Sequence, residues 1–210
     1  MKVWILIFVC MFSMPLLVAV LHFRMRKGQI LKIRQDYVKN ARYFGRSFSA
    51  LVEKALPEMK NGMIMLSRQE KVLETDGKQE FVQPEIEDLI IARNTIFCPQ
   101  QEDLHFQKEI YSEKDALFVK ENIRLRAVYS KKRLLFGNKI RLLRWADAEH
   151  AVAVYDECDL GERVSSGEQL VIGFDNIFHS LYAPVIRLGQ RPEELDRFME
   201  ERDPRIFRMP

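Results

Sequence analysis

The sequence contains few of the residues that carry enzyme and metal chemistry. Its 210 residues include three cysteines and four histidines, and the cysteines do not fall at the spacing of a metal site. It also lacks a glycine-rich phosphate loop, a Ser-x-x-Lys motif and a Cys-x-x-Cys motif. We therefore expect no catalytic residue, no metal site and no cofactor.

An excess of charge of one sign is also missing. Lys and Arg total 33 against 30 for Asp and Glu, which gives a formal net charge of +3. This balance lacks the overall basic signature of a nucleic-acid-binding protein, and we expect no nucleic-acid partner. Cys10 lies in an apolar segment and Cys158 in an apolar repeat, so the cysteines indicate a reducing compartment rather than a disulfide-stapled exterior.

Short apolar triplets return at an almost constant interval between about residues 117 and 186. They begin, in steps of 17, 18 and 18 residues, at Leu117, Leu134, Val152 and Leu170. A second column follows in steps of 17, 18 and 19 residues, at Ile123, Ile140, Cys158 and Ile177. A partial third column, which His179 interrupts, consists of Leu125, Leu142 and Leu160.

A period near 18 built from apolar triplets predicts a parallel β-helix with three strands of about six residues per coil. One coil is too thin to bury its inward residues alone, so these residues stack into ladders between coils. An evenly spaced sandwich of β-meanders is the alternative. The fold class that we expect is mainly β, with the β-helix over 113–188 and a β-rich first part of the same stack over 58–112.

The N-terminal segment predicts a membrane anchor over 1–23. Residues 3–22 contain no Asp, Glu, Lys or Arg and are long enough to cross a bilayer as a helix. Basic residues follow the segment rather than precede it, which argues against a cleaved signal peptide and a secreted protein. They are candidates for contact with the membrane surface: Arg24, Arg26, Lys27, Lys32 and Arg34. We expect a single-pass protein of the cell membrane with its C-terminal body in the cytoplasm.

Two further segments are predicted to contain helices. Over 24–57, apolar residues recur at steps of three and four, with Gly45 as a possible break and Pro57 as the end. The aromatic residues Tyr37, Tyr43 and Phe44 there form either a partner-binding face or a packing face. Over 189–210, a short helix is expected to begin at Pro192, and it either caps the open end of the stack or trails from it.

With these features together, the chain resembles the bactofilins, the polymer-forming cytoskeletal proteins of bacteria. The stretches that carry the resemblance are NKIRLLRWAD (138–147), YDECDLGERV (155–164), QLVIG (169–173) and LYAPVI (181–186). The resemblance implies a right-handed β-helix and a non-enzymatic, membrane-anchored scaffold that self-associates and recruits other proteins. Dense charges depart from the family pattern and leave a short oligomer or a monomeric adaptor open: Arg133, Arg141, Arg144 and Arg163.

The enzyme alternative is a hexapeptide-type acyltransferase with a left-handed β-helix. It needs a histidine at a coil corner as general base, and His150, which follows Asp147 and Glu149, is the candidate. A six-residue phase does not persist along the repeat, so a solvated corner residue is the simpler interpretation. The carboxylates at 156, 157 and 159 likewise predict a charged corner rather than a calcium loop. Trp145 is interpreted as packed against the stack, with an exposed binding hot spot as the alternative.

Overall fold

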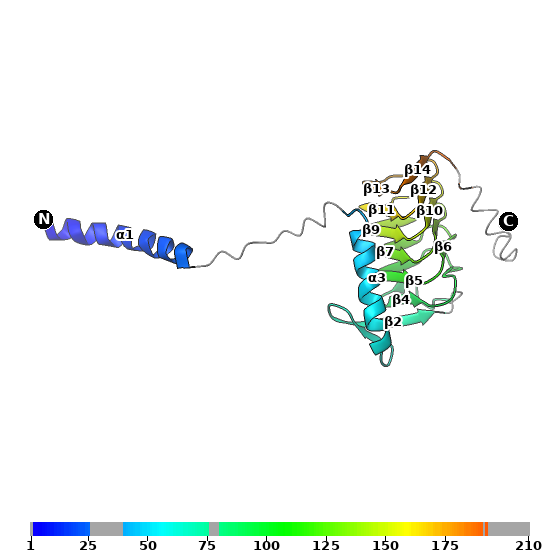
Figure 1. The fold of residues 1–210 in the computed structure, drawn as a ribbon, viewed down its shortest axis with the longest axis horizontal. Helices are drawn as coiled ribbons and strands as arrows, with labels where there is room; N and C mark the ends of the chain where they lie inside the picture. The colour runs from blue at the N-terminus through cyan, green and yellow to red at the C-terminus, as the bar shows by residue number, and fades with distance from the viewer. Residues whose placement is uncertain (1, 26–39, 76–79, 191, 193–210) are drawn as a thin grey trace. The chain divides into compact units, whose positions relative to one another are not determined.

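A computed structural model describes residues 2–25, 40–75, 80–190 and 192 of the chain (Figure 1). The chain divides into two compact units, Met1–Gln35 and Asp36–Pro210, and each is described by itself. Arg26, Lys27, Lys32, Arg34 and Tyr37 lie outside the described residues, as does the predicted helix after Pro192.

The first unit contains one described helix, α1 (Lys2–Met25), which includes Pro15 and Arg24. Large apolar side chains stand exposed along it, among them Trp4, Phe8 and Leu17. Within the described part of the chain, no helix has the length and apolarity needed to cross a membrane. The helix expected near the N-terminus is confirmed, whereas the membrane anchor stays a prediction.

The second unit is a parallel β-solenoid of about six turns, with roughly 18 residues per turn. Its strands are β1 (Met63–Met65), β2 (Gln69–Thr75), β3 (Glu85–Ile86), β4 (Leu89–Ala92), β5 (His105–Ser112), β6 (Ala116–Phe118), β7 (Arg124–Ser130), β8 (Leu134–Phe136), β9 (Arg141–Ala148), β10 (Ala151–Val154), β11 (Arg163–Ser166), β12 (Gln169–Ile172), β13 (Leu181–Tyr182) and β14 (Val185–Leu188). The predicted stack is confirmed, and the sandwich alternative is excluded.

The strands form two sheets. The long sheet has the order β1-β2-β4-β5-β7-β9-β11-β13, with β3 also paired to β5, and the short sheet has the order β14-β12-β10-β8-β6. The pairings between these strands are parallel, apart from β1, which is antiparallel to β2. Register shifts interrupt the ladder of β5, β7 and β9 after their first residues, and we refer to the rows that begin at His105, Arg124 and Arg141 as the third side of the solenoid. Isolated bridges continue this side to Asp159 and Ile177.

The inward ladder of the short sheet corrects one predicted position. Ala116, not Leu117, is the register partner of Leu134, and the ladder continues through Val152 to Leu170 in steps of 18. Leu117 pairs with Leu135 on the opposite face, where both belong to a separate small apolar cluster. The prediction was wrong by one residue because each block offers two adjacent apolar residues for the same place.

The second predicted column is correct for three members and wrong for the fourth. Ile123, Ile140 and Cys158 are buried in the main core. Ile177 is instead the bridge partner of Asp159 and is 67% exposed. Asn176 lies next to Cys158 and accepts a hydrogen bond from its backbone N–H (2.8 Å). A polar residue thus ends this ladder, and the apolar neighbour is turned outward.

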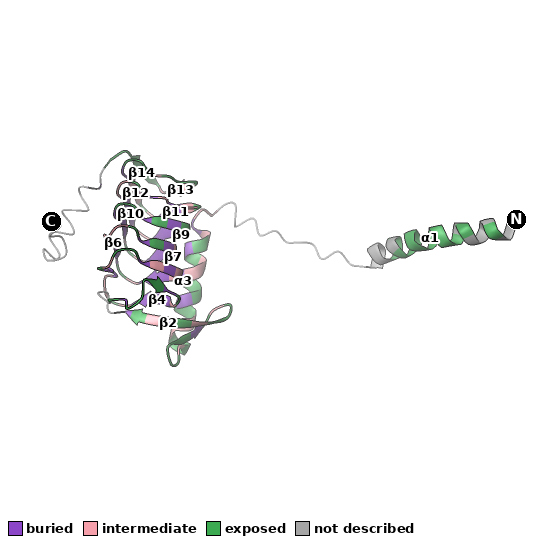
Figure 2. Cartoon of the chain, turned by 180° about the vertical axis from the view of Figure 1, so that it is seen from behind, coloured by how far each residue is buried: buried purple, intermediate pink, exposed green. Residues whose placement is uncertain are grey.

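Aromatic rings fill the first coils of the core. Phe118 stacks on Phe136 with ring centroids 5.8 Å apart, and Phe97 meets Phe118 edge-on at the same distance. Rings stacked between successive turns bury large apolar areas in a narrow interior, which stabilises the solenoid. Buried residues accordingly line the inside of the stack (Figure 2).

A helix covers the outer face of the long sheet. α3 (Tyr43–Ala55) is followed by a 3-10 turn, Leu56–Glu58, in which Pro57 ends the helix as predicted. Val52 is fully buried against the sheet in a cluster that includes Leu89 and Tyr111. Gly45 does not break the helix as expected. It is buried inside α3, and a Cβ there would lie 2.4 Å from the Cβ of Asp147, so only glycine permits this close approach.

Candidate functional site

The N-terminal end of the solenoid is closed. β1 pairs with the edge of β2 in antiparallel register, from Met63 opposite Lys71 to Met65 opposite Gln69. Ile64 of β1 is 2% exposed and belongs to the apolar cluster beneath α3. A strand of three residues beside charged side chains is a poor template for further pairing, so the hairpin also protects this edge.

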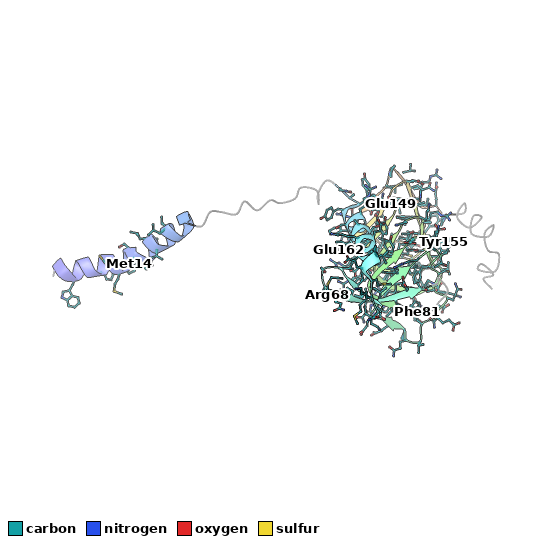
Figure 3. All side chains as sticks on the ribbon, turned by 60° about the horizontal axis from the view of Figure 1, so that its bottom comes forward. Met14, Arg68, Phe81, Glu149, Tyr155 and Glu162 are labelled. Atoms are coloured by element: carbon teal, nitrogen blue, oxygen red, sulfur yellow. The ribbon has the colours of Figure 1, made fainter. Side chains whose placement is uncertain are left out.

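Phe81 completes the cover at the same end. Its ring meets Phe106 edge-on at 5.5 Å, and it is buried in the main core. The side-chain amide of Gln101 binds both backbone groups of Phe81: it accepts a hydrogen bond from the Phe81 N–H (2.7 Å) and donates one to the Phe81 C=O (2.8 Å). Phe81 and Arg68 lie at this end of the stack, with Glu149 further along it (Figure 3).

The C-terminal end is open. β13 pairs only with β11 and β14 only with β12, so within the described residues one side of each strand has no strand partner. Large apolar side chains gather around this end, all of them at least 40% exposed: Phe174, Ile177, Phe178, Tyr182, Val185, Ile186 and Leu188. Among the described residues, strand edges that lack a pairing partner and large apolar side chains exposed to solvent therefore occur together at this end.

Ile186 shows why these side chains are exposed. It is the register partner of Leu170 and so continues the inward ladder of the short sheet. Leu170 is fully buried, whereas Ile186 is 41% exposed, because no described rung lies over it. The last coil therefore presents core residues and unpaired strand edges to solvent, and this combination templates strand addition by another chain.

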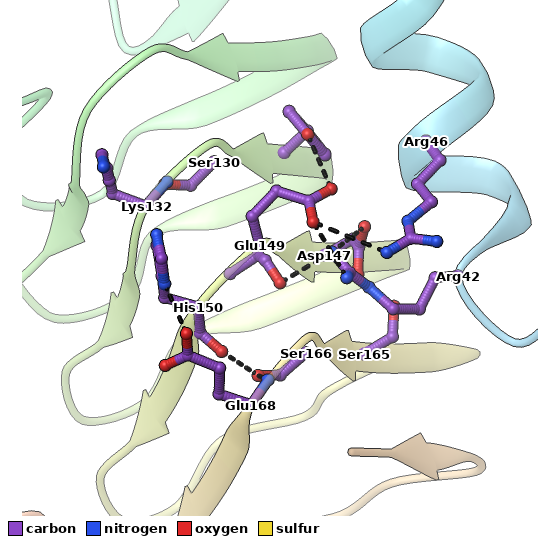
Figure 4. A network of polar contacts seen from close by, with 12 residues as sticks. Arg42, Arg46, Ser130, Lys132, Asp147, Glu149, His150, Ser165, Ser166 and Glu168 are labelled. Atoms are coloured by element: carbon purple, nitrogen blue, oxygen red, sulfur yellow. Dashed lines mark hydrogen bonds and ion pairs between the residues drawn. The ribbon is translucent and has the colours of Figure 1, made fainter. Parts of the chain in front are cut away.

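A buried ion cluster fixes α3 to the stack (Figure 4). Arg42, directly before α3, donates from Nε and Nη2 to the two carboxylate oxygens of Asp147 (2.8 and 3.1 Å). Its Nη1 donates to Glu149 Oε2 (3.0 Å), and its Nη2 also donates to the C=O of Ala148 (2.8 Å). Arg42 and Asp147 are 4% and 1% exposed. The cluster positions the start of the helix over β9.

Burial and hydrogen bonding oppose each other in this cluster. Burial raises the pKa of Asp147, and hydrogen bonds from Arg42 and Ser165 offset part of that rise. Burial also tends to raise the pKa of Glu149. The hydrogen bond from Arg42 and the charge of Arg42 outweigh this effect, so the pKa of Glu149 is lowered. Sequence reasoning missed Arg42, whose only local signal was a basic residue at the start of an amphipathic segment.

The histidine considered for acyl transfer has a different neighbour from the expected ones. His150 Nδ1 lies 2.6 Å from Glu168 Oε1, and the His150 side chain is 43% exposed. Asp147 and Glu149, the expected orienting groups, bind Arg42 instead. Both His150 and Glu168 are therefore corner residues on the surface of the stack.

The remaining candidates take structural places. Trp145 is half-buried and meets Phe48 of α3 edge-on at 5.6 Å, so the packed interpretation is confirmed. Asp156 accepts a hydrogen bond from the Phe174 N–H (2.8 Å) at a coil corner. Across the described ranges, no group of three or more His, Cys, Asp or Glu is placed to hold a metal ion.

The aromatic residues at the start of α3 are only partly covered. Tyr43 and Phe44 meet edge-on at 5.9 Å, and the guanidinium of Arg163 lies over the Phe44 ring at 5.6 Å. Phe44 remains 39% exposed. The face of α3 that enters the core is instead formed by Gly45, Ser49 and Val52.

Comparison with known proteins gives no relative. The chain matches no protein-family model, no curated protein and no solved structure. The resemblance to bactofilins therefore stays a prediction that depends on the four stretches between 138 and 186.

Proposed function

We propose that this chain is a non-enzymatic scaffold that self-associates through the C-terminal end of its solenoid and is attached to a membrane through its N-terminal segment. The observation that carries the proposal is the contrast between a closed first coil and an open last coil. A sheet edge that is left unpaired beside exposed apolar residues favours association with another chain.

The partner at this end is a second copy of the chain. Since β1 covers the first edge of the long sheet, a head-to-tail contact would place β13 against a protected edge. Two open ends that meet across a twofold axis bring like edges together, and the exposed residues Ile186 and Leu188 of both copies cover one another. This contact closes after two copies, so a dimer is its product, and longer polymers need a second interface.

Membrane attachment is supported by the composition of α1. Its described side chains from Trp4 to Leu21 include ten large apolar residues that are between 48% and 76% exposed. The basic residues from 24 to 34 would contact anionic headgroups and keep the body on the cytoplasmic side of the cell membrane. The body would then hold recruited proteins there. A right-handed coil is part of the proposal, in line with the strong preference of parallel crossover connections.

The test is the assembly state of residues 36–210 in sedimentation velocity. The fragment must include α3, because Val52 belongs to the core beneath it. We expect a concentration-dependent dimer that Leu188→Glu abolishes, since a buried charge at the contact is costly. The matched control is Met65→Glu at the closed end, where the side chain is similarly exposed (63% against 55%) and also lies on an edge strand.

Two other results would replace the proposal. A monomer that dimerises only after removal of 193–210 would show that the chain's own C-terminal segment covers the open end. Equal dimerisation of the Leu188→Glu variant would place the contact elsewhere. Membrane attachment is checked separately by alkaline carbonate extraction of the full chain, which would release it if α1 did not hold it in lipid.

Acyl transfer remains the second candidate because His150 and Glu168 form a close imidazole–carboxylate pair on one corner. It predicts that acetyl-CoA raises the melting temperature of the protein and that a closed trimer forms. The scaffold proposal predicts neither. A melting temperature unchanged by acetyl-CoA at millimolar concentration would remove this candidate.

A further inference from the structure

A groove of about 610 Å³ lies on the third side of the solenoid and extends from His105 to His179 of the last coil. The cationic side chains of Arg124, Arg126 and Arg141 line it, together with His105 and His179. We refer to it as the arginine groove.

Two of these arginines stand next to each other on successive coils. Arg124 at the start of β7 is the direct register partner of Arg141 at the start of β9. His105 precedes Arg124 in the same ladder. Neighbouring strands lie about 4.8 Å apart, and like charges at directly opposed positions repel each other. The pairing is therefore mildly unfavourable, and an anion between the two guanidinium groups would relieve the repulsion.

The protein supplies only part of the compensating charge. Arg126 donates to Glu109 Oε1 (3.2 Å), so its charge is balanced within the long sheet. Arg141 lies 3.8 Å from Asp159, and both side chains are about half exposed, which makes the interaction weak. Arg124 forms no ion pair with any residue that the structure describes. Asp159 and Glu162 also line the groove, and Glu85, Asp103 and Glu157 line an adjoining hollow with both arginines, but none of these described carboxylates forms an ion pair with Arg124.

The geometry points to a phosphate-type oxyanion, which we propose binds in the arginine groove between Arg124 and Arg141. The planar guanidinium fork matches the oxygens of a phosphate group, and two forks on adjacent coils can hold one group from two sides. A soluble phosphate compound and a phospholipid headgroup share this chemistry. The two arginines lie in β7 and β9, outside the open end's edge strands, although His179 of the same groove belongs to the last coil.

The first experiment measures binding of pyrophosphate to the full chain in neutral detergent by isothermal titration calorimetry. We expect Arg124→Gln and Arg141→Gln each to weaken binding by about tenfold or more, because each removes a charge-assisted, bidentate contact. Arg144→Gln is the matched control. Arg144 is an exposed arginine of the same strand, β9, that does not line the groove, and its loss should change binding less than twofold.

The second experiment separates the two sources of phosphate. Residues 36–210, which contain the groove and the core but not α1, are floated with vesicles of phosphatidylcholine alone or with added phosphatidic acid. Flotation with phosphatidic acid that Arg124→Gln abolishes would assign the groove to a lipid headgroup. Calorimetric binding without flotation would assign it to a soluble phosphate compound. Absence of both, or an equal effect of Arg144→Gln in the two assays, would overturn the proposal.

Discussion

The two ends of the solenoid are made from the same kind of coil but finish in different ways. At the first coil, a hairpin covers the edge of the long sheet and an aromatic ring covers the inward core, and that ring, Phe81, is 8% exposed. At the last coil, Ile186 continues the ladder and is 41% exposed. The inward pattern is apolar at both ends. The difference between a protected and a reactive end is thus decided by the segment that covers the coil, not by the coil itself.

The largest expected effect comes from detaching the helix that covers the outer face of the long sheet. Arg42→Ala leaves Asp147 charged and buried without its partner, and we expect a loss of about 3–5 kcal/mol in the free energy of unfolding. Urea denaturation of residues 36–210 measures it. The matched control is Arg46→Ala, because Arg46 is 55% exposed and lies 3.7 Å from Glu149 of the same cluster, which predicts a loss below about 0.5 kcal/mol.

A second substitution in the same chain tests the cause. Arg42→Ala combined with Asp147→Asn removes the uncompensated charge, so the double variant should recover part of the lost stability. If the double variant is no more stable than Arg42→Ala, lost packing rather than charge holds the helix in place.

The same truncation at each end compares a side chain that the hairpin and α3 cover with one that no described rung covers. Ile64→Ala removes a buried side chain and should cost about 2–4 kcal/mol in unfolding free energy. Ile186→Ala should cost about 1 kcal/mol or less in the monomer, since this side chain already meets solvent. Denaturation at low protein concentration gives both values. Similar losses at the two ends would mean that the last coil is covered after all.

The smallest expected effect is a difference in how often the coils near the two ends of the solenoid open locally, measured by the labelling rates of buried thiols. Residues 36–210 contain two cysteines, Cys98 near the closed end and Cys158 near the open end, both 1% exposed. Burial raises the pKa of the Cys158 thiol to about 12, so labelling needs an opening of the coil. We expect Cys158 to react with a disulfide reagent on the order of tenfold faster than Cys98 under native conditions. Faster labelling of Cys98 than of Cys158 would show that the closed end, not the open end, opens more readily.

The sequence allowed the β-helix to be predicted because a stacked core requires a constant step, and four blocks preserve it. It did not allow each register to be predicted. Leu134 and Leu135 are equally apolar, so only the backbone pairing shows that Leu117 belongs with the second of them. The steps also change at the ends, from 18 to 16 between Leu170 and Ile186, as corner lengths vary.

The site was harder to predict than the fold. An open end is defined by what does not cover it, and no local pattern in residues 174–188 expresses this. The contact between Arg42 and Asp147 joins positions 105 residues apart, which a single sequence does not reveal. Of the two arginines of the groove, only Arg141 was noted, as part of a dense charge pattern, and Arg124 was missed, because their alignment depends on a register of 17 residues between them.

The course of α3 has a mechanical consequence. Its 13 residues span about 20 Å at 1.5 Å per residue, close to the distance over four neighbouring strands. Its buried face and Phe48 contact the long sheet from β4 through β5 and β7 to β9, so one rigid rod ties these rungs together. β11 contributes the contact of Arg163 with Phe44, but the apolar cluster beneath α3 includes no described residue from the later rungs. If the stack were pulled along its axis, the strands that α3 covers would stay folded at forces that already unfold the last coils.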